Sequence, residues 1–437
     1  MTPVPNRPDK ALPDATIFAL SSGAPPAAIA VLRISGPDAR RVLAQLTGGA
    51  LPEPRRASLR PLRDLNGALL DQALVLQFPS PATATGEDMA EVHCHGGRAV
   101  IAAVERALEA LGCRRAEPGE FTRRAFLNGR MDLAEAEGLA DLLAAETELQ
   151  RQAAIGLAGG HFSAHVEGWR ETVLRLSAMV EAALDFADDY DVSAQAQNFA
   201  EDAASLADEL TRWLDRPRAE RLKEGVRVVI AGPPNSGKST LFNALLEDEA
   251  AITSPEAGTT RDALERPVAI GGVPFTFVDT AGLRDKGAGA IEAIGITRAH
   301  EHITRADLVL WLGPEGNGPA GALEVESKID ENCHQGKHKP DHRVSGLTGE
   351  GLDQLKRDLV ERVRHLLPKP GQLALNERQA RLLSAARDSL KHIASSADEL
   401  VIAEHLRQTR LAFDSLLGRV ATEDMLDALF GRFCIGK

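Results

Sequence analysis

The stretch that decides the fold is Gly232-Pro233-Pro234-Asn235-Ser236-Gly237-Lys238-Ser239-Thr240. Residues 226–230 are typical of a strand leading into it, and residues 241–246 of a helix following it. A G-x-x-x-x-G-K-S spacing between strand and helix predicts a phosphate-binding loop, whose backbone N–H groups surround phosphate oxygens at a helix N-terminus. Lys238 is then placed to reach the β- and γ-phosphates, and the Ser239 hydroxyl to bind Mg²⁺. The predicted nucleotide contacts in this loop are Asn235, Ser236, Gly237, Lys238, Ser239 and Thr240.

Two downstream stretches predict the rest of the phosphate and metal site. Residues 275–282 indicate a strand that ends in Asp279-Thr280-Ala281-Gly282, a D-x-x-G pattern. We expect the Asp279 carboxylate beside Mg²⁺ and the Gly282 N–H facing the γ-phosphate. Between the loop and this strand lies Gly258-Thr259-Thr260, where the Thr260 hydroxyl can complete the metal site once nucleotide orders the segment.

Two further stretches indicate guanine as the base. Ser327-Lys328-Ile329-Asp330 differs by one residue from the N-K-x-D pattern in which an Asp accepts from guanine N–H groups. Ser345-Gly346-Leu347 is similar to the S-A-x loop that also contacts guanine. We therefore predict a GTPase with GTP as its substrate. Leu283 stands where small GTPases carry the glutamine that orients the attacking water, so either another group supplies that stabilisation or hydrolysis is very slow.

Composition limits the class of protein. The 437 residues are enough for two to four domains. The first residues have no hydrophobic signal core, and no apolar run approaches the length that spans a membrane, so we expect a cytoplasmic protein without a membrane segment. The four cysteines are scattered and indicate free thiols. A net charge of −13 argues against general coating of nucleic acid.

A local basic face is still compatible with that net charge. Five arginines fall between residues 114 and 130, opposed within the stretch by only Glu117 and Glu120. They form either a basic face or an ordinary solvated surface, and the sequence leaves both readings open. The arginines are Arg114, Arg115, Arg123, Arg124 and Arg130.

The chain is predicted to be a multidomain protein. Residues 1–130 mix strand-like runs with helices, which predicts an α+β domain. Residues 131–224 and 371–437 show apolar residues at helical spacing, and residues 225–370 hold the α/β P-loop GTPase domain. Because neither helical part alone has enough helices to bury both faces, we predict one α-helical bundle into which the GTPase domain is inserted.

Several further stretches match the pattern of a known family. They are Leu32-Arg33-Ile34-Ser35-Gly36, the Thr85–Glu91 and His95-Gly96-Gly97 stretch, Pro118-Gly119-Glu120-Phe121, Arg124–Asn128, and the end Phe433-Cys434-Ile435-Gly436-Lys437. The C-terminal F-C-I-G-K is the most specific of these signals. On these stretches, over nearly the whole sequence, the chain resembles the MnmE (TrmE) family of GTPases that modify the tRNA wobble uridine.

The resemblance implies particular chemistry. Family members form homodimers and work on tRNA with a flavoprotein of the GidA (MnmG) type, in a heterotetramer. The complex adds an aminomethyl or carboxymethylaminomethyl group to C5 of the wobble uridine, with the one-carbon unit taken from 5,10-methylene-tetrahydrofolate; 5-formyl-tetrahydrofolate is a related ligand. The N-terminal domain would bind the folate and dimerise. By position, the folate contacts would be Arg33, Glu91, Arg130 and Lys437, with Cys434 a candidate catalytic thiol or an ordinary cysteine.

The resemblance also implies an answer to Leu283. GTPase domains of the family pair across the nucleotide, with K⁺ in place of an arginine finger. The K⁺ ligands would be Asn235 and the carbonyls of Ser254, Glu256 and Thr259, and Glu292 would orient the attacking water. The catalytic set is then Glu292, Lys238 and Cys434, and the nucleotide contacts extend to Ser254, Gly258, Thr259, Thr260, Thr280, Ala281 and Gly282.

The sequence departs from the family pattern on the base-binding side. Ser327 replaces the Asn that ties the base loop to the phosphate loop and contacts guanine, so we expect one hydrogen bond to be lost, worth about 0.5–1.5 kcal/mol, and guanine to be bound more weakly. Gly346 replaces the usual Ala. Only residues 313–321 join two strand-like runs, so the helix expected in that crossover is predicted to be absent.

Two other functions stay open at this point. One is a regulatory or ribosome-assembly GTPase, a binding switch without modification chemistry. The other is a folate-dependent aminomethyltransferase of small molecules with an accessory GTPase domain. Folate binding separates the first from the predicted enzyme, and analysis of tRNA nucleosides separates the second.

Overall fold

The computed structural model describes residues 15–185, 192–247, 265–279, 301–331, 336–396 and 398–436. The chain divides into two compact units. The first comprises residues 1–140, 163–170 and 410–437, and the second comprises residues 141–162 and 171–409. Among the described residues, no helix is both long and apolar enough to cross a membrane.

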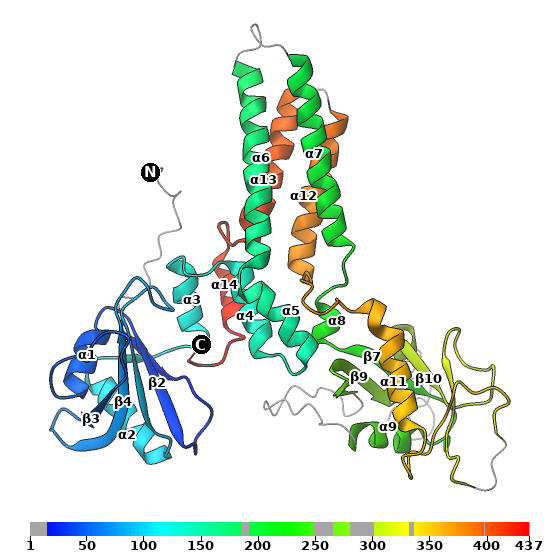
Figure 1. Cartoon of the computed structure of the whole chain (residues 1–437), viewed down its shortest axis with the longest axis horizontal. Helices are drawn as coiled ribbons and strands as arrows, with labels where there is room; N and C mark the ends of the chain where they lie inside the picture. The colour runs from blue at the N-terminus through cyan, green and yellow to red at the C-terminus, as the bar shows by residue number, and fades with distance from the viewer. Residues whose placement is uncertain are drawn as a thin grey trace, which may run out of the picture. The chain divides into compact units, whose positions relative to one another are not determined.

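The first unit is built on a six-stranded sheet in the order β3-β4-β5-β2-β1-β6. Neighbouring strands run antiparallel except β1 and β6. Helices α1 and α2 pack on one face (Figure 1). The strands are β1 (Ile17–Leu20), β2 (Ile29–Ser35), β3 (Ser58–Arg63), β4 (Leu69–Phe78), β5 (Met89–His95) and β6 (Arg114–Arg115). The helices are α1 (Ala39–Leu46), α2 (Arg98–Ala110), α3 (Glu120–Leu127) and α14 (Glu423–Phe430).

Alternation along the strands of the first unit explains its core. Residues such as Leu32, Ile34 and Val92 are fully buried against α1 and α2, because successive side chains of a strand point to opposite faces. The other face carries Arg33 and Glu91. The predicted α+β domain is therefore confirmed.

The second unit contains a six-stranded sheet in the order β12-β11-β10-β7-β9-β8. All neighbours are parallel except β8 and β9. Because β7 is buried on both faces, it is a nearly continuous apolar run. The elements are β7 (Val226–Ala231), α9 (Lys238–Glu247), β8 (Glu265–Ile270), β9 (Val273–Asp279), β10 (Leu308–Trp311), β11 (Leu323–Glu326), β12 (His342–Arg343) and α11 (Leu352–Val363), followed by the short 3₁₀ helix Arg364–Leu366.

Helices from both sides of the GTPase domain pack together, as the sequence predicted. Helix α7 from the N-terminal side lies along α12 from the C-terminal side (Figure 1). Within the first unit, Trp169 of α6 and Phe413 of α13 meet with ring centroids 5.9 Å apart. The helices are α4 (Leu133–Leu143), α5 (Glu148–Ala158), α6 (His161–Asp185), α7 (Val192–Leu214), α8 (Glu220–Lys223), α12 (Glu377–Ser395) and α13 (Glu399–Leu416).

The crossover from β10 to β11 contains no helix over residues 312–322, all of which are described, so the predicted loss of that helix is confirmed. A compact loop replaces it. The indole Nε1 of Trp311 donates to the Pro314 carbonyl at 2.9 Å, and its ring lies against Gly318. Lys337, which lies between β11 and β12, donates to the Trp311 carbonyl at 2.7 Å and so connects this segment to the end of β10.

Candidate functional site

The phosphate loop lies between β7 and α9, at the carboxyl end of the parallel sheet. Gly232 (φ 154°) and Gly237 (φ 84°) both have positive φ angles that glycine adopts without strain. A Cβ at Gly232 would lie 2.9 Å from Ser236 Oγ and 3.2 Å from the Gly313 backbone N, so there is little space for a side chain at this position. Asn235 is a non-glycine residue with positive φ (62°), at the exposed tip of the loop.

Three predicted phosphate and metal residues lie at the end of this loop, two at the start of α9 and one at the end of β9. The Lys238 side chain, almost fully buried, donates from Nζ to the Pro233 carbonyl at 2.7 Å, which places its ammonium inside the curve of the loop. Ser239 donates from Oγ to Asp279 Oδ2 at 2.8 Å. Because β7 and β9 are parallel neighbours, the residues after both strands lie at one edge of the sheet. A hydroxyl and a carboxylate oxygen in contact are hard donors that fit Mg²⁺.

The base side of the site is formed by the loops after β11 and β12. Ser327 donates from Oγ to the Ser236 carbonyl at 2.6 Å. The shorter serine therefore keeps the tie between the base loop and the phosphate loop, and the predicted loss of a hydrogen bond to guanine stays a prediction. Ser345, fully buried, donates from Oγ to Asp330 Oδ1 at 2.5 Å. Lys328 takes a positive φ of 63°, which turns the chain between Ser327 and Asp330.

Several predicted site residues lie outside the described residues, so their roles stay predictions. They include the predicted K⁺ carbonyls, the second Mg²⁺ hydroxyl, the predicted water-orienting carboxylate and the C-terminal lysine. These residues are Ser254, Glu256, Gly258, Thr259, Thr260, Thr280, Ala281, Gly282, Glu292 and Lys437.

In the first unit, the structure brings together two of the predicted folate residues. Arg33 and Glu91 are directly opposite partners of β2 and β5. Arg33 donates from Nε and Nη2 to Glu91 Oε1 at 3.1 and 3.0 Å, and His93 Nε2 lies 3.3 Å from Glu91 Oε2. Both side chains of the Arg33–Glu91 pair are partly exposed, so the pair can exchange partners with a ligand. Arg130 instead donates from Nε to the Thr83 carbonyl at 3.1 Å.

The C-terminal tail is attached to the same unit by backbone contacts. Ile435 forms an antiparallel bridge with Pro118, and Ser21 donates from Oγ to the Gly436 carbonyl at 3.0 Å. Cys434, between these contacts and α14, is exposed. Cys94 and Cys113 differ from it, because burial raises the pKa of each thiol to about 11 and keeps it protonated at neutral pH. Cys434 is thus the accessible thiol among the described cysteines.

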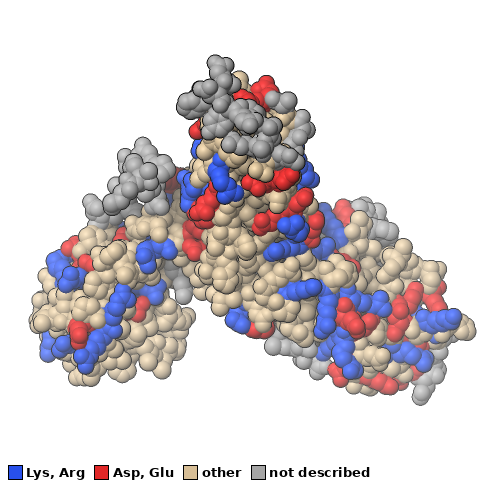
Figure 2. All heavy atoms as spheres, turned by 45° about the horizontal axis from the view of Figure 1, so that its top comes forward, with Lys and Arg blue, Asp and Glu red and all other residues tan. Residues whose placement is uncertain are grey.

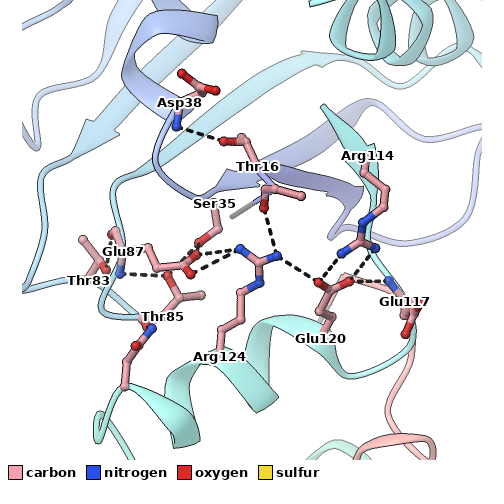
Figure 3. Close-up of polar contacts among 12 residues, drawn as sticks. Thr16, Ser35, Asp38, Thr83, Thr85, Glu87, Arg114, Glu117, Glu120 and Arg124 are labelled. Carbon is pink, nitrogen blue, oxygen red and sulfur yellow. Dashed lines mark hydrogen bonds and ion pairs between the residues drawn. The ribbon is translucent and has the colours of Figure 1, made fainter. Parts of the chain in front are cut away.

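Four of the five arginines in this stretch form ion pairs with carboxylates, while Arg115 and Arg130 are exposed to solvent. Arg124 is 1% exposed and donates to Glu87 and Glu120, each at 3.0 Å, and to the Ala15 carbonyl (Figure 3). Arg114 also binds Glu120. Elsewhere in the stretch, Arg115 pairs with Glu105 and Glu109, and Arg123 with Glu423 and Asp427. Because these ion pairs neutralise four of the five arginines, the stretch does not favour a basic face for nucleic acid, and the exposed Arg115 and Arg130 fit a solvated surface.

Glu120 shows the electrostatic balance of this network. Burial alone would raise the pKa of the Glu120 carboxyl, but hydrogen bonds from Arg114, the Glu117 N–H and Arg124 leave its pKa below the ordinary value. Ser35 extends the network, since its hydroxyl donates to Glu87 at 2.7 Å and lies 2.7 Å from the Thr85 hydroxyl (Figure 3). The network was not predicted from the sequence. Its members could have been found there, because Ser35, Glu87, Glu120 and Arg124 all fall within the stretches that carry the family resemblance.

Outside this network, charges of both signs are interspersed on the face shown in Figure 2. Among the described residues, no group of three or more His, Cys, Asp or Glu side chains is arranged to hold a metal ion. The phosphate loop with Lys238, the Ser239–Asp279 pair and the two loops that position Asp330 define a P-loop nucleotide hydrolase of the GTPase class.

Comparison with known proteins gives the family. The MnmE helical domain matches residues 133–434, and the GTP-binding protein TrmE N-terminus matches residues 16–130. A tRNA modification GTPase MnmE of Erythrobacter litoralis is 63% identical over 97% of this chain and 100% of its own length. One of Novosphingobium aromaticivorans is 59% identical over 97% of this chain and 99% of its own. The chain belongs to the MnmE (TrmE) family of tRNA modification GTPases.

Solved structures add only a distant likeness. The G domain of the T. maritima FeoB iron transporter is 25% identical, covers 32% of this chain and 99% of that chain, and gives a TM-score of 0.22. A score that low carries no argument about this chain.

Proposed function

We propose that the chain hydrolyses GTP in a Mg²⁺-dependent, K⁺-stimulated reaction coupled to tRNA modification. With a flavoprotein of the GidA (MnmG) type, it would add an aminomethyl or carboxymethylaminomethyl group to C5 of the wobble uridine, using a tetrahydrofolate one-carbon unit. The observation that carries the nucleotide part is the Ser239–Asp279 hydrogen bond beside the buried Lys238. In this arrangement Lys238 would neutralise phosphate charge, and Ser239 would bind the metal.

The potassium part rests on Asn235. Its side chain is exposed at the tip of the phosphate loop, and its amide oxygen is the kind of hard donor that an alkali cation takes. Potassium would supply positive charge next to the negative charge that develops on the transferred phosphoryl group. The apolar side chain of Leu283 cannot provide such stabilisation. Asn235 would position that charge, and Glu292 would orient the attacking water.

The folate part rests on the Arg33–Glu91 pair. Glu91 keeps acceptor capacity beyond its bonds to Arg33 and His93, because an ionised carboxylate offers about four lone-pair sites. It can therefore accept from the N–H groups of a pterin ring, while Arg33 can bind a ring oxygen or the carboxylate tail. The tail bridge between Pro118 and Ile435 attaches Cys434 to this same unit.

The proposal of a homodimer is supported by an exposed apolar region on the same face of the sheet. Leu59, Leu74, His93 and Val31 are directly opposite one another across β3, β4, β5 and β2, so they form one row. In this chain, Leu59 is 63% exposed and Leu74 is 45% exposed. The neighbouring row contains Leu76, Glu91 and Arg33. A second copy covering this apolar row would also shield the folate pair from water.

The test of the nucleotide mechanism is GTP hydrolysis in KCl and in NaCl at equal ionic strength. We expect strong stimulation by KCl that Asn235→Ala removes, because the side-chain ligand is lost. The matched control is Asn317→Ala, an exposed asparagine in the β10–β11 loop, which keeps the stimulation. Equal slow rates in both salts would overturn the potassium mechanism.

A regulatory GTPase switch without modification chemistry is the alternative. Binding of 5-formyl-tetrahydrofolate to the full chain, measured by calorimetry, separates the two functions. We expect binding that Glu91→Gln weakens, since the amide cannot replace a carboxylate acceptor. A chain that hydrolyses GTP but binds no folate would instead be such a switch.

A further inference from the structure

The two residues that depart from the family pattern on the base side both lie directly against the phosphate loop and α9. Ser327 donates to the Ser236 carbonyl at 2.6 Å. A Cβ built on Gly237 would lie 3.4 Å from the Ser327 Cβ, so the base loop and the phosphate loop are in van der Waals contact. The short side chain at position 327 permits this close contact between the two loops.

Gly346 makes the second close contact. A Cβ at this position would lie 2.9 Å from the carbonyl carbon and oxygen of Thr240 and 3.0 Å from the Leu241 N. All three atoms belong to the backbone of the first turn of α9, which cannot yield as a flexible side chain can. The φ angle of Gly346 is not in the positive region, so the close approach, and not backbone conformation, is what requires glycine.

Ser345 joins these two contacts. Its buried hydroxyl donates to Asp330 Oδ1 and accepts from the backbone N–H groups of Leu347 and Thr348, at 3.2 and 3.1 Å. Asp330 is therefore fixed from two directions. The Ser327 contact sets the start of its own loop, and the Gly346 contact sets the position of the Ser345 hydroxyl that holds its carboxylate.

We infer that Ser327 and Gly346 are a matched pair of positioning residues that set Asp330 against the edge of the base and thereby determine guanine selectivity. The inference rests on the proposed binding of GTP. With serine at 327 the loop after β11 lies close to the phosphate loop. Only glycine at 346 lets the loop after β12 approach α9 closely enough to keep its contact with Asp330. A larger residue at one position alone would displace one loop and move Asp330 away from the base. Larger residues at both positions would displace the two loops in the same direction, so that Asp330 and Ser345 keep their contact.

The test is the ratio of the dissociation constants of inosine diphosphate and guanosine diphosphate, measured by competition with a fluorescent guanine nucleotide. Inosine diphosphate lacks only the exocyclic amine that Asp330 would accept from. For the unaltered chain we expect a preference for guanine of roughly tenfold, the value of one charge-assisted hydrogen bond. We expect Gly346→Ala to reduce the ratio to nearly one, and Ser327→Ala, which adds no atoms, to reduce it in the same direction.

The double variant Ser327→Asn with Gly346→Ala, measured beside each of these two single substitutions, tests the pairing itself. We expect it to regain a larger ratio than Gly346→Ala alone, a non-additive result typical of residues that share one contact. Gly168→Ala in α6, where a Cβ meets nothing within 4 Å, is the control and keeps the full ratio. Equal weakening of both nucleotides in Gly346→Ala, or strictly additive effects, would overturn the inference. A chain that binds neither nucleotide would overturn the proposed function as well, and so is a distinguishable result.

Discussion

At the scale of single residues, Arg124 has the greatest structural consequence in the first unit. Its guanidinium is buried between Glu87 and Glu120. Replacing Arg124 by Met would leave two carboxylates in a buried site without their shared cation. We expect a loss of about 3–5 kcal/mol in the free energy of unfolding of this unit, measured by hydrogen exchange of β2 and β5 in urea.

The matched control for Arg124→Met is Arg56→Met. Arg56 also forms an ion pair, with Glu53, but the two side chains are 74% and 68% exposed. Such a pair contributes only about 0–1 kcal/mol. If both substitutions had the same small effect, the buried network would not be what holds α3 to the sheet.

At the scale of elements, the caps of the helices differ in a way that can be measured. Thr147 caps α5 with a reciprocal pair of hydrogen bonds, since its side chain accepts from the Gln150 N–H and the Gln150 side chain accepts from the Thr147 N–H. Thr422 is at the N-cap of α14 but makes no such side-chain bond. We expect Thr147→Ala to cost about 1 kcal/mol in the opening free energy of α5, measured by hydrogen exchange.

Thr422→Ala is the same substitution at a helix start that lacks the capping bond, so we expect it to change the exchange of α14 by much less. A comparable loss in both helices would mean that the cost comes from the altered backbone preference of threonine and not from the capping bond.

At the scale of the whole molecule, the apolar row on the first sheet predicts the oligomeric state. A charge introduced in the row by Leu74→Glu would be buried in the proposed dimer without a partner, so we expect dissociation to a monomer of 46.7 kDa in light scattering. Leu400→Glu on α13 changes an equally apolar residue, 69% exposed, and we expect it to leave the dimer intact. A dimer that survives Leu74→Glu would place the contact between copies elsewhere.

The sequence by itself determined the parts of this protein that depend on local pattern. The phosphate loop between β7 and α9 followed from the spacing of Gly232, Gly237 and Lys238, because that backbone conformation is encoded within a few residues. The missing helix after β10 followed from the length of the link between its two flanking strands. Each of these features is decided by residues close together in the chain.

Only the tertiary structure decided the contacts between residues far apart. Five nearby arginines left a basic face and a solvated surface open, and only the fold shows that carboxylates from other segments, Asp427 and Glu87, pair with Arg123 and Arg124. Ser327 was expected to lose one of the contacts of the asparagine it replaces, and the approach of two loops decides that the contact with Ser236 is kept. The place of Gly346 against α9 depends on the same approach. The physical reason is that the energy of an ion pair or a close contact depends on separation and burial in space, which a local pattern does not specify.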